Sequence, residues 1–436
     1  MPLTQKRQFD RETLENFIAS RNEPDWVQKR RRSAFENYQQ FFEEPLPEEE
    51  WKRVDLRIFQ PDRFHIVRDT QTRKPLKTAL QDRTRFGGQS VQLNSQSVEV
   101  SLNEQIEKQG VVFGSLADLI HTHASLIQPN LMTKAVLPAC DRFSAWHAAF
   151  WTGGTFLYIP KNVTIEEPLH SLLALSKDGA ADFSHTLIIL EEGASATLLE
   201  ETVSTDETIA GLHVGAVELL VAPRANLRYV QLQNWNRKTY HFAHQTGKID
   251  RDARLEWTVA GLGSCLAHVH QDIELDGRGA EAVVNGVSFA HGRQLISYYT
   301  QQTHHAPNTN SDLLYKQVLR DQSRAVWRGM IKVDPQAQQT DGYQRNDALL
   351  LSSDCRNDAI PGLEIEADDV RCTHGATAGR VDEEQLFYTM SRGMTEFEAM
   401  HMIVEGFFQK VYDRIGVESV RETLRQTVEK KLGIGD

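Results

Sequence analysis

The stretch EEGASATLLEETVSTDETIAGLHVGAVELLVAPRA, residues 191–225, decides the fold of this chain. It runs from one polar turn that ends in a small residue, Ala194, to another that ends at Ala225. Between the turns lie short runs of branched and apolar residues, which favour strands. The turn recurs as DRDA ending at Ala253 and DGRG ending at Gly279, so successive turns are 31, 28 and 26 residues apart.

A repeat of about 30 residues made of short strands and small corner residues is typical of a solenoid. Each coil leaves an apolar face that the next coil covers. Later turns, ending at Ser323 and Ala337, are spaced irregularly. We therefore expect a mainly β protein built on a parallel β-helix. The alternative is a β-sandwich or jelly roll in which similar turns happen to recur.

Helical patterns flank the strand-rich region. Phe35, Tyr38 and Phe42 have helical spacing before Pro45, and a second apolar stripe runs from Met400 to Val411. We expect a helical domain over residues 1–56, an irregular linker over 57–97, the β-helix over 98–375 and a second helical domain over 376–436. Within the β-helix region only residues 116–126 show helical periodicity.

Composition narrows the class of protein. The chain has 436 residues, of which 40% are hydrophobic, and a formal net charge of −12, which argues against a nucleic-acid-binding surface. The basic run 29–32 is interpreted as a solvated helix face. Four dispersed cysteines without a CxxC motif suit a reducing compartment. No segment has the ~20 apolar residues that cross a bilayer, so we expect a cytoplasmic protein without a membrane partner.

Catalytic motifs are missing from the sequence. It contains no GxxxxGK[ST] phosphate loop, no GxGxxG after a strand, and no HExxH or GxSxG. A carbohydrate-active β-helix would need an acidic cluster and aromatic sugar platforms on one sheet, and no convincing set occurs. Glu364, Glu366, Asp368 and Asp369 are interpreted as surface residues. We expect the chain not to be an enzyme.

The strongest metal-binding candidates are Cys355, Cys372 and His374. Thiolate and imidazole are natural ligands of iron, zinc and copper, and the polar residues around these positions predict accessible thiols. The two cysteines are 17 residues apart, about half a coil, so they need not be adjacent. We expect half of a site, completed by a second chain. The alternative is two ordinary cysteines on a rim.

Histidine pairs and the other two cysteines are weaker candidates. His268 and His270 would face the same way on a strand and could share a ligand, as could the pairs His121/His123 and His304/His305. Surface or corner histidines are the simpler interpretation of each pair. The apolar or small neighbours of Cys140 and Cys265 predict buried, inert thiols.

Four long motifs carry a resemblance to a known family: EPDWVQKRRRSAFENY (23–38), DRFSAWHAAFWTGGTFLYIPKNVTIEEPL (141–169), HHAPNTNSDLLYKQVLRDQSRAVWRGMIKVDPQAQQTDGYQRNDALLLS (304–352) and LEIEADDVRCTHGATAGRVDEEQLFYTMSRG (363–393). With GVVFGSLADL (110–119), they resemble the SufB/SufD family of iron–sulfur cluster assembly proteins. Only about 57–97 lies outside the match. RCTHGATAGR resembles the SufD branch, whereas the SufB branch typically has HEATTSK-like residues from position 374.

The resemblance implies a right-handed parallel β-helix and a scaffold role in a SufBCD-type complex. The partners would be a SufC-like ATPase and a SufB-like paralogue, with a homodimer possible for the isolated chain. Iron or an iron–sulfur cluster would be held transiently in the complex and not stably by the isolated chain. His374 matches an interface ligand proposed for SufD. Cys355 matches a SufB cysteine, which keeps a SufB-like cluster scaffold open as an alternative, beside a purely structural adaptor.

The resemblance also implies that the ATPase docks on the C-terminal helices. The candidate contact residues there are apolar or aromatic, with one arginine: Leu386, Phe387, Tyr388, Arg392, Phe407 and Phe408.

Overall fold

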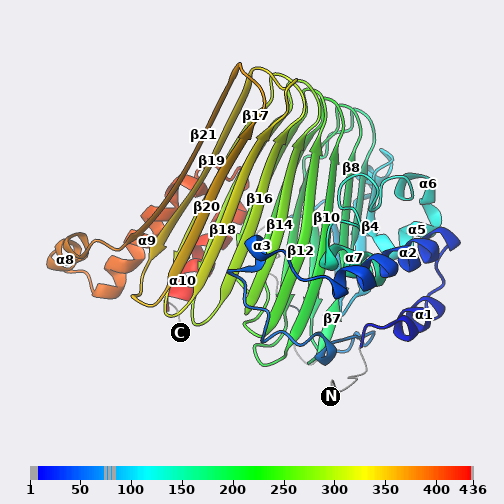
Figure 1. Cartoon of the computed structure of the whole chain (residues 1–436), viewed down its shortest axis with the longest axis horizontal. Coiled ribbons are helices and arrows are strands. Elements are labelled where there is room, and N and C mark those ends of the chain that lie inside the picture. Colours follow the sequence, from blue (N-terminus) through cyan, green and yellow to red (C-terminus); the bar gives the residue numbers. More distant parts are fainter. Residues whose placement is uncertain (1–7, 73–75, 77–79, 81–84, 434–436) are drawn as a thin grey trace.

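The computed structural model describes residues 8–72, 76, 80 and 85–433, and its main body is a parallel β-helix (Figure 1). From β8 onward, consecutive strands alternate between two facing sheets, so each coil places one strand in each sheet. Strands within each sheet are parallel, apart from the antiparallel pairs β2–β3 and β4–β5. The parallel pairing confirms the β-helix and excludes the sandwich, whose sheets are antiparallel.

Both sheets are long. The 11-stranded sheet contains β1 (His65–Ile66), β4 (Val112–Ser115), β5 (Thr155–Ile159), β7 (Ala180–Asp182), β8 (His185–Leu190), β10 (Gly211–Val221), β12 (Thr239–Ile249), β14 (Leu266–Leu275), β16 (Leu295–His304), β18 (Arg324–Val333) and β20 (Arg356–Ile365). The 10-stranded sheet contains β2 (Gly88–Leu93), β3 (Gln96–Leu102), β6 (Leu169–Leu175), β9 (Ser195–Ser204), β11 (Asn226–Asn234), β13 (Arg254–Gly261), β15 (Glu281–Ala290), β17 (Asn310–Leu319), β19 (Thr340–Leu350) and β21 (Val370–Arg380).

The strand register confirms the repeat and explains its irregular part. One residue per coil adopts a left-handed backbone at the same corner, and these residues lie 27 to 31 positions apart: Asn162, Gly193, Arg224, Asp252, Gly279, Asn308 and Gln339. The backbone N–H of each donates to a carbonyl in the corner of the next coil, as Asn308 does to Gln338 at 2.9 Å. Ser323 lies in the opposite corner, and the true equivalents of the earlier turns are at Asn308 and Gln339.

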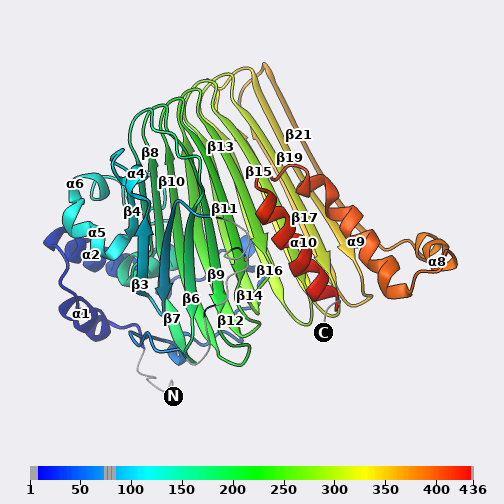
Figure 2. The same ribbon diagram turned by 180° about the vertical axis from the view of Figure 1, so that it is seen from behind.

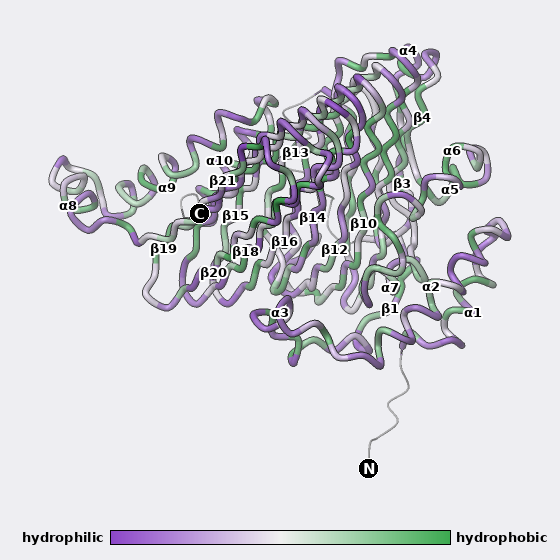
Figure 3. Tube along the Cα trace, turned by 45° about the horizontal axis from the view of Figure 1, so that its top comes forward, coloured by the Kyte–Doolittle hydropathy of each residue, from purple (hydrophilic) through white to green (hydrophobic). Residues whose placement is uncertain are grey.

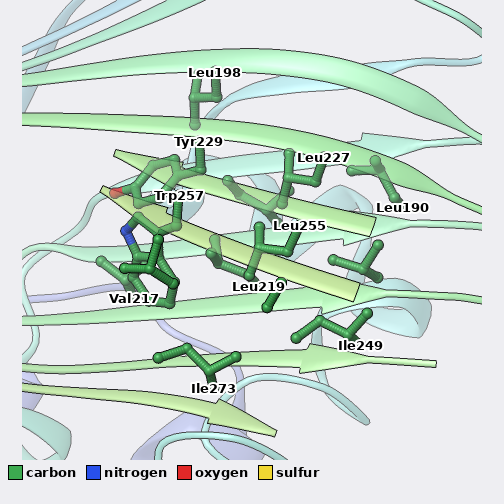
Figure 4. Close-up of a cluster of buried hydrophobic side chains, with 14 of the residues drawn as sticks. Leu190, Leu198, Val217, Leu219, Leu227, Tyr229, Ile249, Leu255, Trp257 and Ile273 are labelled. Atoms are coloured by element: carbon green, nitrogen blue, oxygen red, sulfur yellow. The ribbon is translucent and has the colours of Figure 1, made fainter. Parts of the chain in front are cut away.

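Apolar side chains from both sheets fill the space between them (Figure 4). Leu219 of β10, Ile249 of β12 and Leu255 of β13 point into this core and are fully buried. In Figure 3 the strands around β10 are largely hydrophobic, whereas many turns of the coils are hydrophilic. Stacking of like side chains from successive coils therefore forms one continuous core.

N-terminal helices cover the outer face of the 11-stranded sheet at its first strands (Figure 1). They are α1 (Arg11–Ala19), α2 (Asp25–Glu43), α3 (Glu48–Trp51), α5 (Leu116–Thr122), α6 (Ala124–Ile127) and α7 (Arg142–Phe150), with a short 3₁₀ helix, Pro61–Arg63. Helix α4 (Glu104–Glu107) instead buries Ile106 in the core between the two sheets. The expected helices before Pro45 and after Leu116 are confirmed. The sequence pattern does not predict α7, because all of its side chains from Phe143 to Phe150 are buried and leave no amphipathic pattern.

C-terminal helices α8 (Glu383–Ser391), α9 (Glu396–Tyr412) and α10 (Glu418–Leu432) follow the last strand. Figure 2 shows α9 and α10 lying across the outer face of the 10-stranded sheet, while α8 extends beyond β21. A capping box begins α9, since Thr395 and Glu398 exchange side chain–backbone hydrogen bonds there. Among the described helices, none combines the length and apolar character that crossing a bilayer requires.

Two element boundaries differ from the sequence-based ones. Strand β2 falls within the segment 57–97 and pairs in parallel with β6, so part of that segment belongs to the 10-stranded sheet. Strand β21 continues past residue 375 to Arg380. Its last residues are small or polar, and the parallel ladder with β19 sets their conformation.

Candidate functional site

The C-terminal end of the β-helix is open. In the described part of the chain, β20 pairs only with β18 and β21 only with β19, so each has one free edge. No residue of either strand is fully buried. Unpaired N–H and C=O groups along such edges are ready to pair with another chain.

Cys355 lies at the corner before β20 and is buried, with 7% of its surface exposed. Its thiol donates to the carbonyl oxygens of Ser352, at 3.0 Å, and Leu319, at 3.5 Å, and packs with Ala325 and Ala348. The polar sequence context predicts an accessible thiol, and this prediction is wrong for Cys355. The corner turns its side chain under the preceding coil while the polar neighbours face outward.

Cys372 and His374 lie on β21. Alternation along a strand places both on the same face, where Cys372 pairs in register with Gly342 and His374 with Gln344. Cys372 is half-buried beside Ile331, and burial raises the pKa of its thiol. His374 is exposed. An imidazole and a thiol are thus presented at the open end.

Cys355 does not belong to the same local group. It packs on Ala325, whereas Cys372 packs on Ile331, six positions further along β18, which is roughly 20 Å at the rise of a strand. Three histidine–carboxylate groups among the described residues have donor atoms close enough to hold one metal ion, and none of them includes Cys355, Cys372 or His374. These three residues form at most a partial site within one chain.

An exposed apolar surface surrounds α8 and the start of α9. We call it the α8 patch, and it consists of Phe387, Tyr388, Met390, Met394, Phe397 and Met402. Phe387 is 74% exposed, and the Arg392 guanidinium lies 4.9 Å from the centre of the Tyr388 ring. Exposed aromatic and methionine side chains on two helices in contact are typical of a protein-binding surface.

The other candidate contact residues differ in accessibility. Leu386 is half-buried, and Phe407 is half-buried below the Lys316 ammonium, which lies 4.4 Å from the ring centre. Phe408 is fully buried in the cluster that joins α9 to β15 and β17. A direct contact role for Phe408 is therefore wrong, because the stripe that ends α9 faces the sheet.

One polar cluster is recognisable only in part from sequence. The pair His268/His270 lies against α3, where both rings hydrogen-bond Glu50, and Asp141 and His244 lie beside them. The HxH spacing is the available signal. Glu50 and Asp141 are remote in sequence, and only the packing of the N-terminal helices on β12 and β14 brings them there.

Two family models and several named relatives match this chain. The SufBD core domain of the SUF iron–sulfur cluster assembly system matches residues 173–407, and the SufBD N-terminal region matches 12–170. An iron–sulfur cluster assembly SufBD family protein of Staphylococcus saprophyticus is 31% identical over 341 residues, which cover 78% of this chain and 73% of that protein. SufBD family proteins of Staphylococcus haemolyticus and Staphylococcus aureus are 31% and 30% identical, again over 78% of this chain and 73% of the relative. The chain belongs to the SufBD family of iron–sulfur cluster assembly proteins.

Proposed function

We propose that this chain is a SufD-like, non-catalytic scaffold subunit of a cytoplasmic SufBCD-type complex. Its open end would pair with a SufB-like paralogue, and its C-terminal helices would dock a SufC-like ATPase. The observation that carries the proposal is the free edge of β21, a strand that carries Cys372 and the exposed His374. The open end would receive iron and sulfide as the substrates of cluster assembly.

A shared site follows from the incomplete ligand set. An iron–sulfur cluster needs about four thiolate or imidazole ligands, and this chain offers two on one strand. A second chain paired along β21 would supply the others. Cys355 would join only after a movement of the last coil, because its thiol is buried and hydrogen-bonded.

The ATPase would supply the energy for that movement. The chain has no phosphate loop, and the α8 patch offers apolar surface beyond the body of the β-helix. Helix α8 joins β21 directly through Val381 and Asp382. A displacement of α8 by the ATPase would therefore act directly on the strand that carries Cys372 and His374.

Anaerobic co-expression with SufB-like and SufC-like partners tests the assembly role. Iron and sulfide per complex are measured for wild type, Cys355→Ser, Cys372→Ser and His374→Ala, with His121→Ala as a matched exposed-histidine control. We expect Cys372→Ser and His374→Ala to lower cluster content while the complex stays intact, and the control to match wild type. Unchanged cluster content in all three variants would support the structural adaptor instead.

A SufB-like cluster scaffold is the second candidate, and Cys355 is the residue that favours it. In that case Cys355→Ser would lower cluster content most strongly. Alkylation of Cys355, followed by mass spectrometry, would also rise when the ATPase partner binds nucleotide. Protection of this thiol throughout the nucleotide cycle would contradict that role.

A further inference from the structure

A cluster of histidines and carboxylates lies below α3, and its residue types differ from the cysteine and histidine at the open end of the β-helix. We call Glu50, Asp141, His244, His268 and His270 the α3 cluster. Glu50 comes from α3, Asp141 caps the N-terminus of α7, and the histidines come from β12 and β14. Three imidazoles and two carboxylates thus meet on the outer face of the 11-stranded sheet.

The donor atoms are already close to the spacing of a metal site. Oε1 of Glu50 lies 3.1 Å from Nε2 of His268 and 2.8 Å from Nε2 of His270. In a tetrahedral site with bonds of about 2.0–2.1 Å, neighbouring ligand atoms are roughly 3.3 Å apart. All three donor atoms lie within 4.8 Å of one another, so small rotations would let them surround one ion.

Neighbouring side chains hold the rings in this arrangement. Nδ1 of His268 lies 3.0 Å from the Ser297 hydroxyl, which leaves Nε2 facing Glu50. Bound histidines usually have such an outer partner, which fixes the tautomer and the ring orientation. The His268 ring also packs against Trp51, with 4.3 Å between ring centres. His270 stacks on His244 at 4.6 Å and 5° between the ring planes.

Burial and charge suit a bound cation. The side chains of His268, His270 and Glu50 are 3%, 15% and 21% exposed, so the group is shielded from water but not sealed off. Glu50 is the carboxylate of the ligand set, and the Nε2 atoms of both histidines face it.

We propose that Glu50, His268 and His270 bind one divalent first-row transition ion of the Zn(II) or Fe(II) class. Two imidazoles and one carboxylate form a ligand set that such ions favour. His244, which pairs with Asp141 at 3.3 Å, stacks on His270 and flanks the ion. The ion fastens α3 to β14. Strands β16 and β18 separate β14 from the edge strand β20, so this site is distinct from the open end.

A second group of possible metal ligands, Glu274, Asp276 and His305, serves as the comparison for the proposed site. It also has three donors near one another, but it contains one histidine, and Lys248 forms ion pairs with both of its carboxylates. A cation already occupies the charge-balancing position there. His305→Gln is therefore the matched control variant.

The test uses the isolated full-length chain after chelator treatment, so it does not depend on the assembly role. Co(II) titration is followed by visible d–d absorption, and Zn(II) affinity is then measured by competition. We expect one equivalent bound by wild type and by His305→Gln. Glu50→Gln and His270→Gln each remove a proposed ligand. Each should weaken Zn(II) binding by more than roughly tenfold, which is the usual effect of losing only the hydrogen-bond partner of a ligand.

Ser297→Ala provides a variant that keeps all three ligands. It should weaken Zn(II) binding by roughly tenfold, because only the outer partner of His268 is lost. Circular dichroism and the metal-free unfolding midpoint show whether each variant is folded. Wild-type affinity in the Glu50, His270 and Ser297 variants, or no Co(II) absorption in wild type, would overturn the site.

Discussion

Arg31 shows at the residue scale what a buried charge requires, since 0% of its side chain is exposed. Its guanidinium donates two hydrogen bonds of 2.7 Å to Glu23 and one of 3.1 Å to the Ala149 carbonyl. The interpretation of the run 29–32 as a solvated face is therefore wrong for Arg31. Successive side chains of α2 point in different directions around the helix axis, and this one points at α7.

Replacing Glu23 by Gln should destabilise the fold strongly. The guanidinium would stay buried without its counter-charge, which costs about 3–5 kcal/mol in comparable pairs. Glu15→Gln removes the partner of Arg32 in a partly exposed pair and should cost less than about 1 kcal/mol. Urea unfolding followed by tryptophan fluorescence measures both, and equal small losses would contradict the buried-pair argument.

The same pair predicts an acid dependence. Burial would raise the pKa of Glu23, but the charge and hydrogen bonds of Arg31 lower it below the ordinary 4.5. A carboxyl whose pKa is lowered in the folded state makes its full contribution to stability above pH 4.5. This contribution is lost as the pH falls through the pKa of the folded state. The stability difference between wild type and Glu23→Gln should therefore shrink below about pH 4.5. A constant difference down to pH 3 would argue against it.

At the element scale, substitutions in α8 and α9 should have different effects, one on partner binding and the other on stability. Phe387 is exposed, so Phe387→Ser should change the free energy of unfolding by less than about 0.5 kcal/mol yet reduce co-purification with a SufC-like ATPase. Phe408 is buried below α9, and Phe408→Ala should cost about 3–5 kcal/mol. Pull-down and thermal unfolding of both variants check this. Undiminished ATPase capture by Phe387→Ser would remove the α8 patch as the docking surface.

The corner ladder gives a second prediction for an element. Gly193 has φ of 70°, and a Cβ there would lie 2.4 Å from Oδ1 of Asn162. Gly193→Ala should therefore destabilise the β-helix by about 1–2 kcal/mol. At Gly375 on β21, no heavy atom lies within 4 Å of the position that a Cβ would take, so Gly375→Ala should have little effect. Equal unfolding midpoints for the two variants would contradict the ladder as a source of stability.

On the scale of the whole molecule, the β-helix is closed at one end and open at the other. Strands β3 and β4 end the two sheets at the first coils, where Ile106 of α4 is buried in the core between the sheets, whereas no residue of the end strands β20 and β21 is fully buried. Leu363 and Ile365 are exposed along β20. This asymmetry favours pairing of two chains end to end through the last coil.

Self-association of the isolated chain should depend on this end. Leu363→Lys with Ile365→Lys places two charges on the free edge, and we expect the dimer fraction in sedimentation velocity to fall severalfold. Val98→Lys with Val100→Lys changes two exposed residues of β3 at the far end and should leave it unchanged. A dimer fraction that responds to the β3 variant instead would move the interface to the far end and contradict this prediction.

Sequence alone determined the β-helix, because the repeat comes from residues that each coil must place at the same corner. Stripes at Phe35 and Val404 likewise specified the terminal helices, since each buries one face. Helix α7 could not be predicted, because it is buried on all sides and its helical period is hidden.

Only the tertiary structure decided which chemical groups meet. The sequence pointed to Cys355, Cys372 and His374 as candidate ligands, but the corner at Cys355 buries its thiol while β21 exposes His374. Glu50 and His270 are 220 residues apart and share a hydrogen bond. Repetition is a local property that spacing records, whereas burial and long-range contact depend on how helices pack on the coils.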